Sequence, residues 1–151
     1  MKVLFVCLGN ICRAPSADGI LRKKLAEHGI ADKVTVDSAG TGDWHIGKAP
    51  DTRSQKAALE RGYEISMLRA RQVAAEDFNE FDYVLAMDNS NIENMQEFKP
   101  KGAMRTEPEL FLKRFGANSD VTEVPDPYYG GEEGFQTVLD LIEAACANLV
   151  V

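Results

Sequence analysis

Val3-Leu-Phe-Val6-Cys7-Leu-Gly-Asn-Ile-Cys-Arg13-Ala-Pro-Ser16 is the stretch that predicts how this chain folds. Its apolar run, Val3–Val6, is typical of a buried strand. Pro15 is favoured at the first position of a helix, so a loop is expected to join the strand to a helix start. A helix start presents unpaired N–H groups and a partial positive charge, which together bind anions. Arg13 adds a planar fork of donors that matches phosphate oxygens.

Cys7 ends the strand and is expected to face this anion site. The positive field should lower the pKa of the Cys7 thiol and favour its thiolate. The loop before Arg13 is long enough to curl around one tetrahedral anion with its N–H groups pointing inward. Its residues are Leu8, Gly9, Asn10, Ile11 and Cys12. A nucleophile beside a bound oxyanion indicates attack on phosphorus. The spacing alone also fits a plain turn with a buried cysteine, but the flanking strand and helix favour the phosphate site.

Strand-like and helix-like segments alternate along the rest of the chain. Helices are expected from residue 15 to 28, 51 to 61, 88 to 98 and 135 to 149. Strands are expected at residues 34–38, 81–87 and 103–105, and residues 106–131 are rich in turn formers. This alternation predicts an α/β fold, a single three-layer domain over residues 1–151 with a parallel sheet and helices on both faces. Ligands of such folds bind beyond the carboxyl ends of the strands, where Cys7 lies.

The composition narrows the classes of partner. The chain has 151 residues and a net charge of -7, which argues against nucleic acid or an anionic membrane as a partner. No stretch is long and apolar enough for a membrane span, and the start of the chain lacks a signal-peptide pattern. Three cysteines in that setting indicate reduced thiols and a cytoplasmic location. His28 and His45 form no metal-ligand pattern with them, so neither a metal nor another cofactor is expected.

Asp126 is the candidate for a general acid. The leaving oxygen of a phosphate monoester needs a proton in the transition state. Asp126 stands between Pro125 and Pro127, so its backbone is restricted to extended conformations and its carboxyl is held on a stiff loop. Pro-Asp-Pro is also common in ordinary surface turns, and taken alone the segment favours that interpretation.

Three aromatic residues are candidates for the walls of a substrate pocket: Trp44, Tyr128 and Tyr129. An aryl ring needs flat apolar surfaces to stack against. A deep aromatic slot would let phosphotyrosine reach Cys7 and leave phosphoserine short. Trp44 could instead be a partly buried core residue, and the two tyrosines could simply pack their loop.

Three motifs together resemble the low-molecular-weight protein tyrosine phosphatases: Val6-Cys-Leu-Gly-Asn-Ile-Cys-Arg13, Asp37-Ser-Ala-Gly-Thr41 and Asp126-Pro-Tyr-Tyr129. The resemblance covers essentially the whole chain. It implies a small Rossmann-like fold with four strands, of the phosphotyrosine phosphatase I type. It also implies hydrolysis of phosphotyrosine or small aryl phosphates through a cysteinyl-phosphate, with inorganic phosphate as product. In that chemistry Cys7 is the nucleophile, Arg13 and the loop amides bind phosphate, and Asp126 is the general acid and base.

The same resemblance assigns supporting roles. It implies that Asn10 and Ser38 are hydrogen-bonded and hold the unusual backbone of the loop, although either could be a plain turn or strand-end residue. It implies that Cys12 forms a reversible disulfide with Cys7 and protects it from further oxidation. A small buried side chain at Cys12 is the alternative. A monomer or weak dimer is expected.

Ala14 departs from the family pattern, which has serine after the loop arginine. The missing hydroxyl would donate to the Cys7 thiolate, so attenuated activity is expected unless Ser16 compensates. Three rival functions remain open at this point. An arsenate reductase of the same fold would need two further thiols to carry a disulfide to the surface. A non-catalytic module that binds phosphate or phosphotyrosine is encouraged only by Ala14, and a protein that carries phosphate on cysteine is also conceivable.

Overall fold

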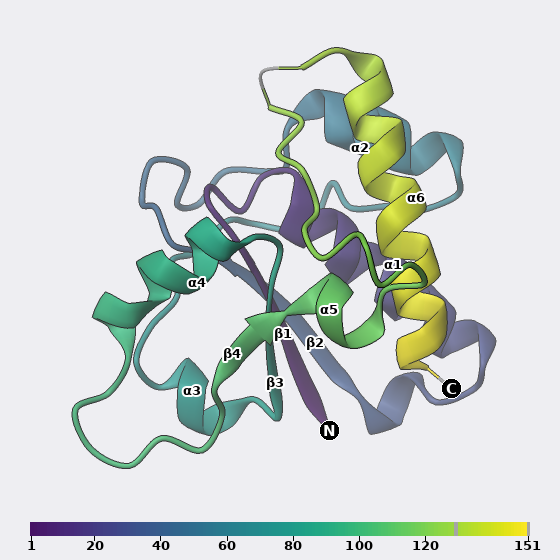
Figure 1. The fold of residues 1–151 in the computed structure, drawn as a ribbon. Coiled ribbons are helices and arrows are strands. Elements are labelled where there is room, and N and C mark those ends of the chain that lie inside the picture. Colours follow the sequence, from purple (N-terminus) through teal and green to yellow (C-terminus); the bar gives the residue numbers. More distant parts are fainter. Residues whose placement is uncertain (129, 151) are drawn as a thin grey trace.

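The computed structural model describes residues 1–128 and 130–150, and it is built around one sheet of four parallel strands in the order β2-β1-β3-β4 (Figure 1). The strands are β1 (Lys2–Cys7), β2 (Thr35–Gly40), β3 (Tyr83–Ala86) and β4 (Pro108–Leu110). The central strand β1 pairs with β2 over its full length and with β3 from Val3 to Val6. All pairs are parallel, so the carboxyl ends of β1, β2 and β3 meet at one edge of the sheet.

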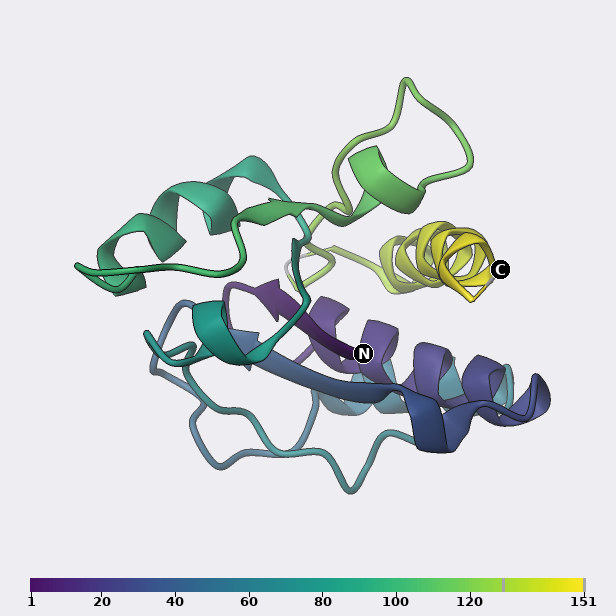
Figure 2. The ribbon, with the colours of Figure 1, turned by 90° about the horizontal axis from the view of Figure 1, so that it is seen from below.

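Helices cover both faces of the sheet (Figure 2). The helical elements are α1 (Arg13–Glu27), η1 (Ala31–Lys33), α2 (Thr52–Glu60), α3 (Asp77–Glu80), α4 (Asn89–Met95), η2 (Gln96–Phe98), α5 (Phe111–Phe115) and α6 (Glu132–Leu149). Side chains from α1, α2, α5 and α6 form one core, and side chains from α3 and α4 form the other. The predicted three-layer α/β fold is therefore confirmed.

Strand β1 shows why this sequence needs two cores. Val3 and Phe5 face the core that contains α1 and α6, whereas Leu4 and Val6 face the core that contains α3 and α4. Successive side chains of a strand point to opposite faces, so a strand covered on both sides is apolar throughout. All four residues are fully buried, which explains the unbroken apolar run in the sequence.

The helix boundaries follow the expected signals. The Asp51 side chain caps α2 by accepting a hydrogen bond from the Arg53 backbone N–H at 2.8 Å. Gly29 and Gly62 adopt positive φ angles of 71° and 88° just beyond α1 and α2. Helix α1 begins at Arg13, two residues before the predicted start. Pro15 therefore lies inside the first turn, where its missing N–H leaves no intrahelical bond unmade.

The predicted fourth strand at residues 103–105 is wrong. Residues 103–107 form a loop, and the strand is Pro108–Leu110, which pairs with β3 at the edge of the sheet. Three half-buried residues give no apolar run, and proline is tolerated at the first position of an edge strand. Helix α5 follows at once, so residues 106–131 hold more regular structure than their turn-forming composition indicates.

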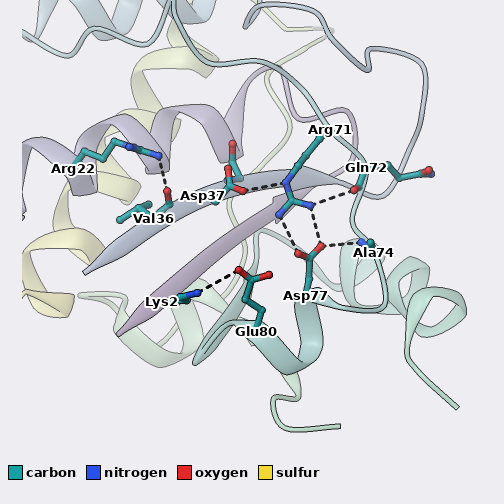
Figure 3. Close-up of polar contacts among 10 residues, drawn as sticks. Lys2, Arg22, Val36, Asp37, Arg71, Gln72, Ala74, Asp77 and Glu80 are labelled. Carbon is teal, nitrogen blue, oxygen red and sulfur yellow. Dashed lines mark hydrogen bonds and ion pairs between the residues drawn. The ribbon is translucent and has the colours of Figure 1, made fainter. Parts of the chain in front are cut away.

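Arg71 ties the end of β2 to α3. Figure 3 shows its guanidinium between two carboxylates, with Nε 3.0 Å from Asp37 Oδ2 and Nη1 3.0 Å from Asp77 Oδ2. The backbone beside Arg71 also pairs with Gly40, whose N–H donates to the Arg71 carbonyl at 2.8 Å. Gly40 is thereby fixed at the carboxyl end of β2, next to the loop that follows β1.

Candidate active site

The loop between β1 and α1 packs directly on Gly40. A Cβ atom at Gly40 would lie 2.8 Å from the Leu8 carbonyl oxygen and 3.1 Å from the Asn10 nitrogen, so only glycine allows this approach. Asn10 has a φ of 56°, a left-handed conformation that asparagine tolerates. The Thr41 N–H donates to the Cys7 carbonyl at 3.0 Å and anchors the start of the loop.

Cys7 lies at the bottom of this loop and is almost completely buried. Its sulfur accepts a hydrogen bond from the Asn10 N–H at 3.2 Å. Burial raises the pKa of the Cys7 thiol, while the Arg13 guanidinium and the N–H groups of Ala14 and Asn10 act to lower it. The expectation of a lowered pKa is therefore wrong for this structure, because the sequence reveals the donors but not the cost of removing the sulfur from water.

Arg13, the first residue of α1, has a buried guanidinium held by groups far away in the sequence. Its Nη1 donates to Asp88 Oδ2 at 2.6 Å and to the Val124 carbonyl at 2.9 Å. Its Nη2 lies 3.6 Å from Asp126 Oδ2. The sheet explains this convergence, since Asp88 follows β3, the neighbour of β1, and Val124 is paired through its N–H to the Met87 carbonyl at 2.7 Å.

In the sequence, Asp88 stands out only as the start of the helix expected from residue 88 to 98, a position that favours a capping role. The structure gives it that role as well, because its Oδ1 accepts from the Asn91 N–H at 2.9 Å while Oδ2 binds Arg13. The available signal was the position of Asp88 just beyond a strand adjacent to β1. Polar side chains at that edge of a parallel sheet are candidates for a shared site.

Asp126 lies beside Arg13, with about a third of its side chain exposed at 37%. Its Oδ1 accepts a hydrogen bond from the Tyr128 N–H at 3.0 Å, which fixes the carboxylate relative to its own backbone. Its Oδ2 is the atom that faces Arg13. The structure therefore brings together Cys7, Arg13 and Asp126, which lie far apart in the sequence.

These residues line a cavity of about 380 Å³. Its described walls contain Cys7, Leu8, Gly9, Ile11, Cys12, Arg13, Trp44, His45, Asp126 and Tyr128. Trp44 is 64% exposed, which identifies it as a wall residue and excludes the core alternative. Tyr128 lies across from the Trp44 segment, with its ring centroid 6.3 Å from that of His45. The candidate Tyr129 lies outside the described residues. His45 was missed, although its position beside Trp44 pointed to the same loop.

The implied hydrogen bond between Asn10 and Ser38 is absent. Among the described residues, neither polar atom of the buried Asn10 side chain has a hydrogen-bond partner. Burial raises the pKa of the Asp18 carboxyl, and hydrogen bonds from Arg22 and Ser38 act against that rise. The close contact of the loop with Gly40 supports the Asn10 backbone instead.

The first turn of α1 determines what surrounds the sulfur. The Ser16 hydroxyl donates to the Cys12 carbonyl at 2.7 Å, so it does not replace the hydroxyl that Ala14 lacks. Burial raises the pKa of the Cys12 thiol to about 12. Cys7 and Cys12 are both free thiols here, as is Cys146 on α6.

Two further observations concern the described part of the chain. Residues 1–128 and 130–150 contain no group of three or more histidine, cysteine, aspartate or glutamate side chains that could hold a metal ion. Within the same residues, every helix is too short or too polar to cross a bilayer.

Comparison with known proteins agrees with this geometry. The family model described as low molecular weight phosphotyrosine protein phosphatase matches residues 2–151. The low molecular weight protein-tyrosine-phosphatase YfkJ of Bacillus subtilis is 41% identical, over 99% of this chain and 94% of that protein. A protein tyrosine phosphatase structure from Entamoeba histolytica has 43% identity and a TM-score of 0.90, covering 99% and 94% of the two chains. The structure of DARP, a Drosophila arginine phosphatase, has 31% identity and a TM-score of 0.91, covering 99% and 96%. Because the family model matches residues 2–151 and these relatives match nearly the full chain, the chain belongs to the low molecular weight phosphotyrosine protein phosphatase family, a class of hydrolases.

Proposed function

We propose that this protein hydrolyses phosphotyrosine and small aryl phosphate monoesters through a cysteinyl-phosphate on Cys7. The observation that carries the proposal is the convergence of a buried thiol, a buried guanidinium and an exposed carboxylate on one cavity. Arg13 and the N–H groups of residues 8–13 would hold the phosphate oxygens, as preorganised donors do for developing charge. Family membership supports a phosphate ester as the substrate.

The first step transfers the phosphoryl group to sulfur. The Cys7 thiolate attacks phosphorus in line with the leaving group, an S–P bond forms, and the P–O bond to the phenol breaks. The electron pair of that bond goes to the phenol oxygen, which takes the proton carried by Asp126. Asp126 is suited to this because it lines the same cavity as Cys7 and lies 3.6 Å from the guanidinium that would hold the phosphate.

The second step releases inorganic phosphate. Water attacks the phosphorus of the cysteinyl-phosphate and gives a proton to the Asp126 carboxylate. The S–P bond breaks with its electron pair returning to sulfur, so Cys7 leaves as a thiolate. The enzyme is then ready for another turnover, with Asp126 again protonated.

The walls of the cavity favour an aryl group. Leu8, Ile11, Trp44 and Tyr128 supply apolar and aromatic surface around the entrance to Cys7. A phenyl ring can stack on such surfaces, whereas the positively charged side chain of a phosphoarginine would find little compensation on Leu8 or Ile11. The DARP structure makes phosphoarginine the right comparison substrate. We expect the aryl ester to be preferred.

The rival functions have less support. An arsenate reductase needs two further thiols beyond the nucleophile. The sequence has three cysteines in all, so Cys12 and Cys146 would both have to serve. Cys146 is fully buried on α6, where burial raises the pKa of its thiol, so it is poorly placed to pass a disulfide to the surface. A purely binding module would not require a carboxylate beside the guanidinium.

The free thiols of Cys7 and Cys12 suit a reducing compartment such as the cytoplasm, with Cys12 as a redox partner.

The test compares wild type with Cys7→Ser on phosphotyrosine, 4-nitrophenyl phosphate and phosphoarginine. Wild type should hydrolyse both aryl esters faster than phosphoarginine. Cys7→Ser should lose turnover and still bind inorganic phosphate, because Arg13 and the loop N–H groups remain. Acid quenching of wild type should trap phosphate on Cys7. Hydrolysis by Cys7→Ser at the wild-type rate would refute the mechanism, and faster hydrolysis of phosphoarginine would refute the assigned substrate class.

A further inference from the structure

We propose that Arg53 is a positioning residue, which holds the segment bearing Asp126 against the phosphate-binding loop. Arg53 is the second residue of α2, and its Nη2 donates to the Tyr128 carbonyl at 2.8 Å. Its guanidinium also lies over two rings, 5.5 Å from the centroid of Tyr128 and 5.0 Å from that of Phe135. This inference rests on the proposed function, since it assigns Arg53 a part in the delivery of the Asp126 proton.

Asp51 anchors the other end of this contact. Its carboxylate receives Arg53 Nε at 3.1 Å on Oδ1 and Arg53 Nη2 at 3.1 Å on Oδ2. The Asp51 backbone N–H donates to the carbonyl of Ile11 in the phosphate-binding loop at 2.8 Å. A continuous series of bonds therefore runs from Ile11 through Asp51 and Arg53 to Tyr128.

Tyr128 passes this restraint on to Asp126. Its N–H donates to Asp126 Oδ1 at 3.0 Å, and its carbonyl accepts from Arg53 at 2.8 Å. The backbone of Tyr128 is thus bonded on both sides, to the proposed acid and to the start of α2. Among the described residues from 116 to 131 there is no helix or strand, so side-chain contacts must do what regular structure does elsewhere.

Arg53 acts at a distance from the reacting atoms. The described residues that line the cavity do not include Arg53, whereas they include Tyr128 and Asp126. Its removal should therefore affect the reaction through the placement of Asp126. Misplacing a proton donor matters most when the leaving group is a poor one, because a good leaving group departs without full protonation.

The experiment measures kcat/KM for phenyl phosphate and 4-nitrophenyl phosphate with wild type, Arg53→Met and Arg53→Lys. This ratio reports the step in which the phenol leaves. For Arg53→Met we expect a loss of about tenfold on phenyl phosphate, the size of one lost hydrogen bond, and less than about twofold on 4-nitrophenyl phosphate. Arg53→Lys keeps the charge and loses the fork that spans Asp51 and Tyr128, so it should show the same selective loss.

Arg61→Met is the matched control. Arg61 also joins the α2 region to α6, through Gln136, Asp140 and Glu143, and it is not among the described residues that line the cavity. It should lower both rates equally or leave both unchanged. In an Asp126→Asn background, Arg53→Met should cause no further loss, because the residue through which it acts is already disabled.

Three results would overturn the inference. Equal losses on the two esters would show that Arg53 acts on folding or binding and not on proton delivery. A full additional loss in the Asp126→Asn background would show that it acts independently of Asp126. A selective loss in Arg61→Met as well would show a general effect of loosening α2. If wild type hydrolyses neither ester, the proposed function itself fails, which the Cys7→Ser comparison identifies separately.

Discussion

Ala14→Ser is the substitution that most directly tests how the protein stabilises the thiolate of Cys7, the proposed nucleophile. In the structure, burial raises the pKa of Cys7 against the opposing effects of Arg13 and of the N–H groups of Ala14 and Asn10. Ala14 is fully buried in the first turn of α1 and offers no side-chain donor. A serine hydroxyl there would add a donor to a thiolate in a site with little access to water.

The expected size of the effect follows from the strength of one added hydrogen bond to the Cys7 thiolate. A hydrogen bond to a charged group contributes roughly 1.5–3 kcal/mol, or about one to two pKa units. At the lower end, the Cys7 pKa falls by about one unit and the thiolate fraction near neutral pH rises about tenfold. Each thiolate becomes about threefold less reactive, because nucleophilicity falls with pKa, so the net gain in alkylation rate is about threefold.

The assay is the rate of alkylation of Cys7 by iodoacetamide as a function of pH, followed by mass spectrometry. Ala14→Val is the control, since it adds volume without a donor, and at a packed site this is expected to cost stability. An alkylation profile of Ala14→Ser that coincides with that of wild type would refute the reasoning. It would mean that the backbone donors and Arg13 already saturate the sulfur.

The remaining predictions concern the groups around the site. Asp88→Asn can keep the helix cap through its amide oxygen, but its NH2 group then faces Arg13 Nη1 and the charge-assisted bond to Arg13 is lost, so kcat/KM should fall about tenfold with little change in melting temperature. An unchanged kcat/KM would show that the Val124 carbonyl suffices to orient Arg13. After brief exposure to peroxide, wild type should regain activity with thiols and Cys12→Ser should not, whereas equal recovery would argue against a disulfide with Cys7. Burial raises the pKa of Asp18 above 3.8, so the protonated carboxyl stabilises the folded protein fully below pH 3.8, and this contribution is lost as pH rises through the folded pKa. In denaturant unfolding, the free energy of unfolding of Asp18→Asn should therefore increase relative to that of wild type as pH rises. A difference between the two that does not change with pH would contradict this.

The sequence was most informative where local chemistry and chain periodicity agree. The apolar run before Cys7 and the residues after it predicted a strand, a loop and a helix, and the structure confirms each of them. The start of the helix expected at residue 51 was readable for the same reason, since the Asp51 cap depends on neighbours within the same turn. The short strand Pro108–Leu110 was misplaced because it owes its existence to pairing with β3 and not to its own apolar pattern.

Contacts between distant segments were beyond the reach of sequence patterns. The bonds of Arg13 to Asp88 and to the Val124 carbonyl join residues separated by 75 and 111 positions. The bond of Arg53 to the Tyr128 carbonyl spans 75. Each depends on which strand ends meet at the edge of the sheet. The pKa of Cys7 was misjudged for a related reason, because burial is a property of the folded molecule.

In the proposed reaction, the proton on Asp126 affects the binding of the phosphate, the ionisation of Cys7 and the departure of the phenol. Arg13 already has Asp88 at 2.6 Å and Asp126 at 3.6 Å, so an arriving phosphate adds negative charge to a site with two carboxylates around one guanidinium. Like charges at such distances are unfavourable, and a proton on Asp126 relieves the repulsion. The charge of Asp126 also raises the pKa of Cys7, so protonating Asp126 makes the thiolate easier to form. A protonated Asp126 would therefore reduce the negative charge around the bound phosphate and remove the charge that opposes the Cys7 thiolate, before it donates its proton to the leaving group.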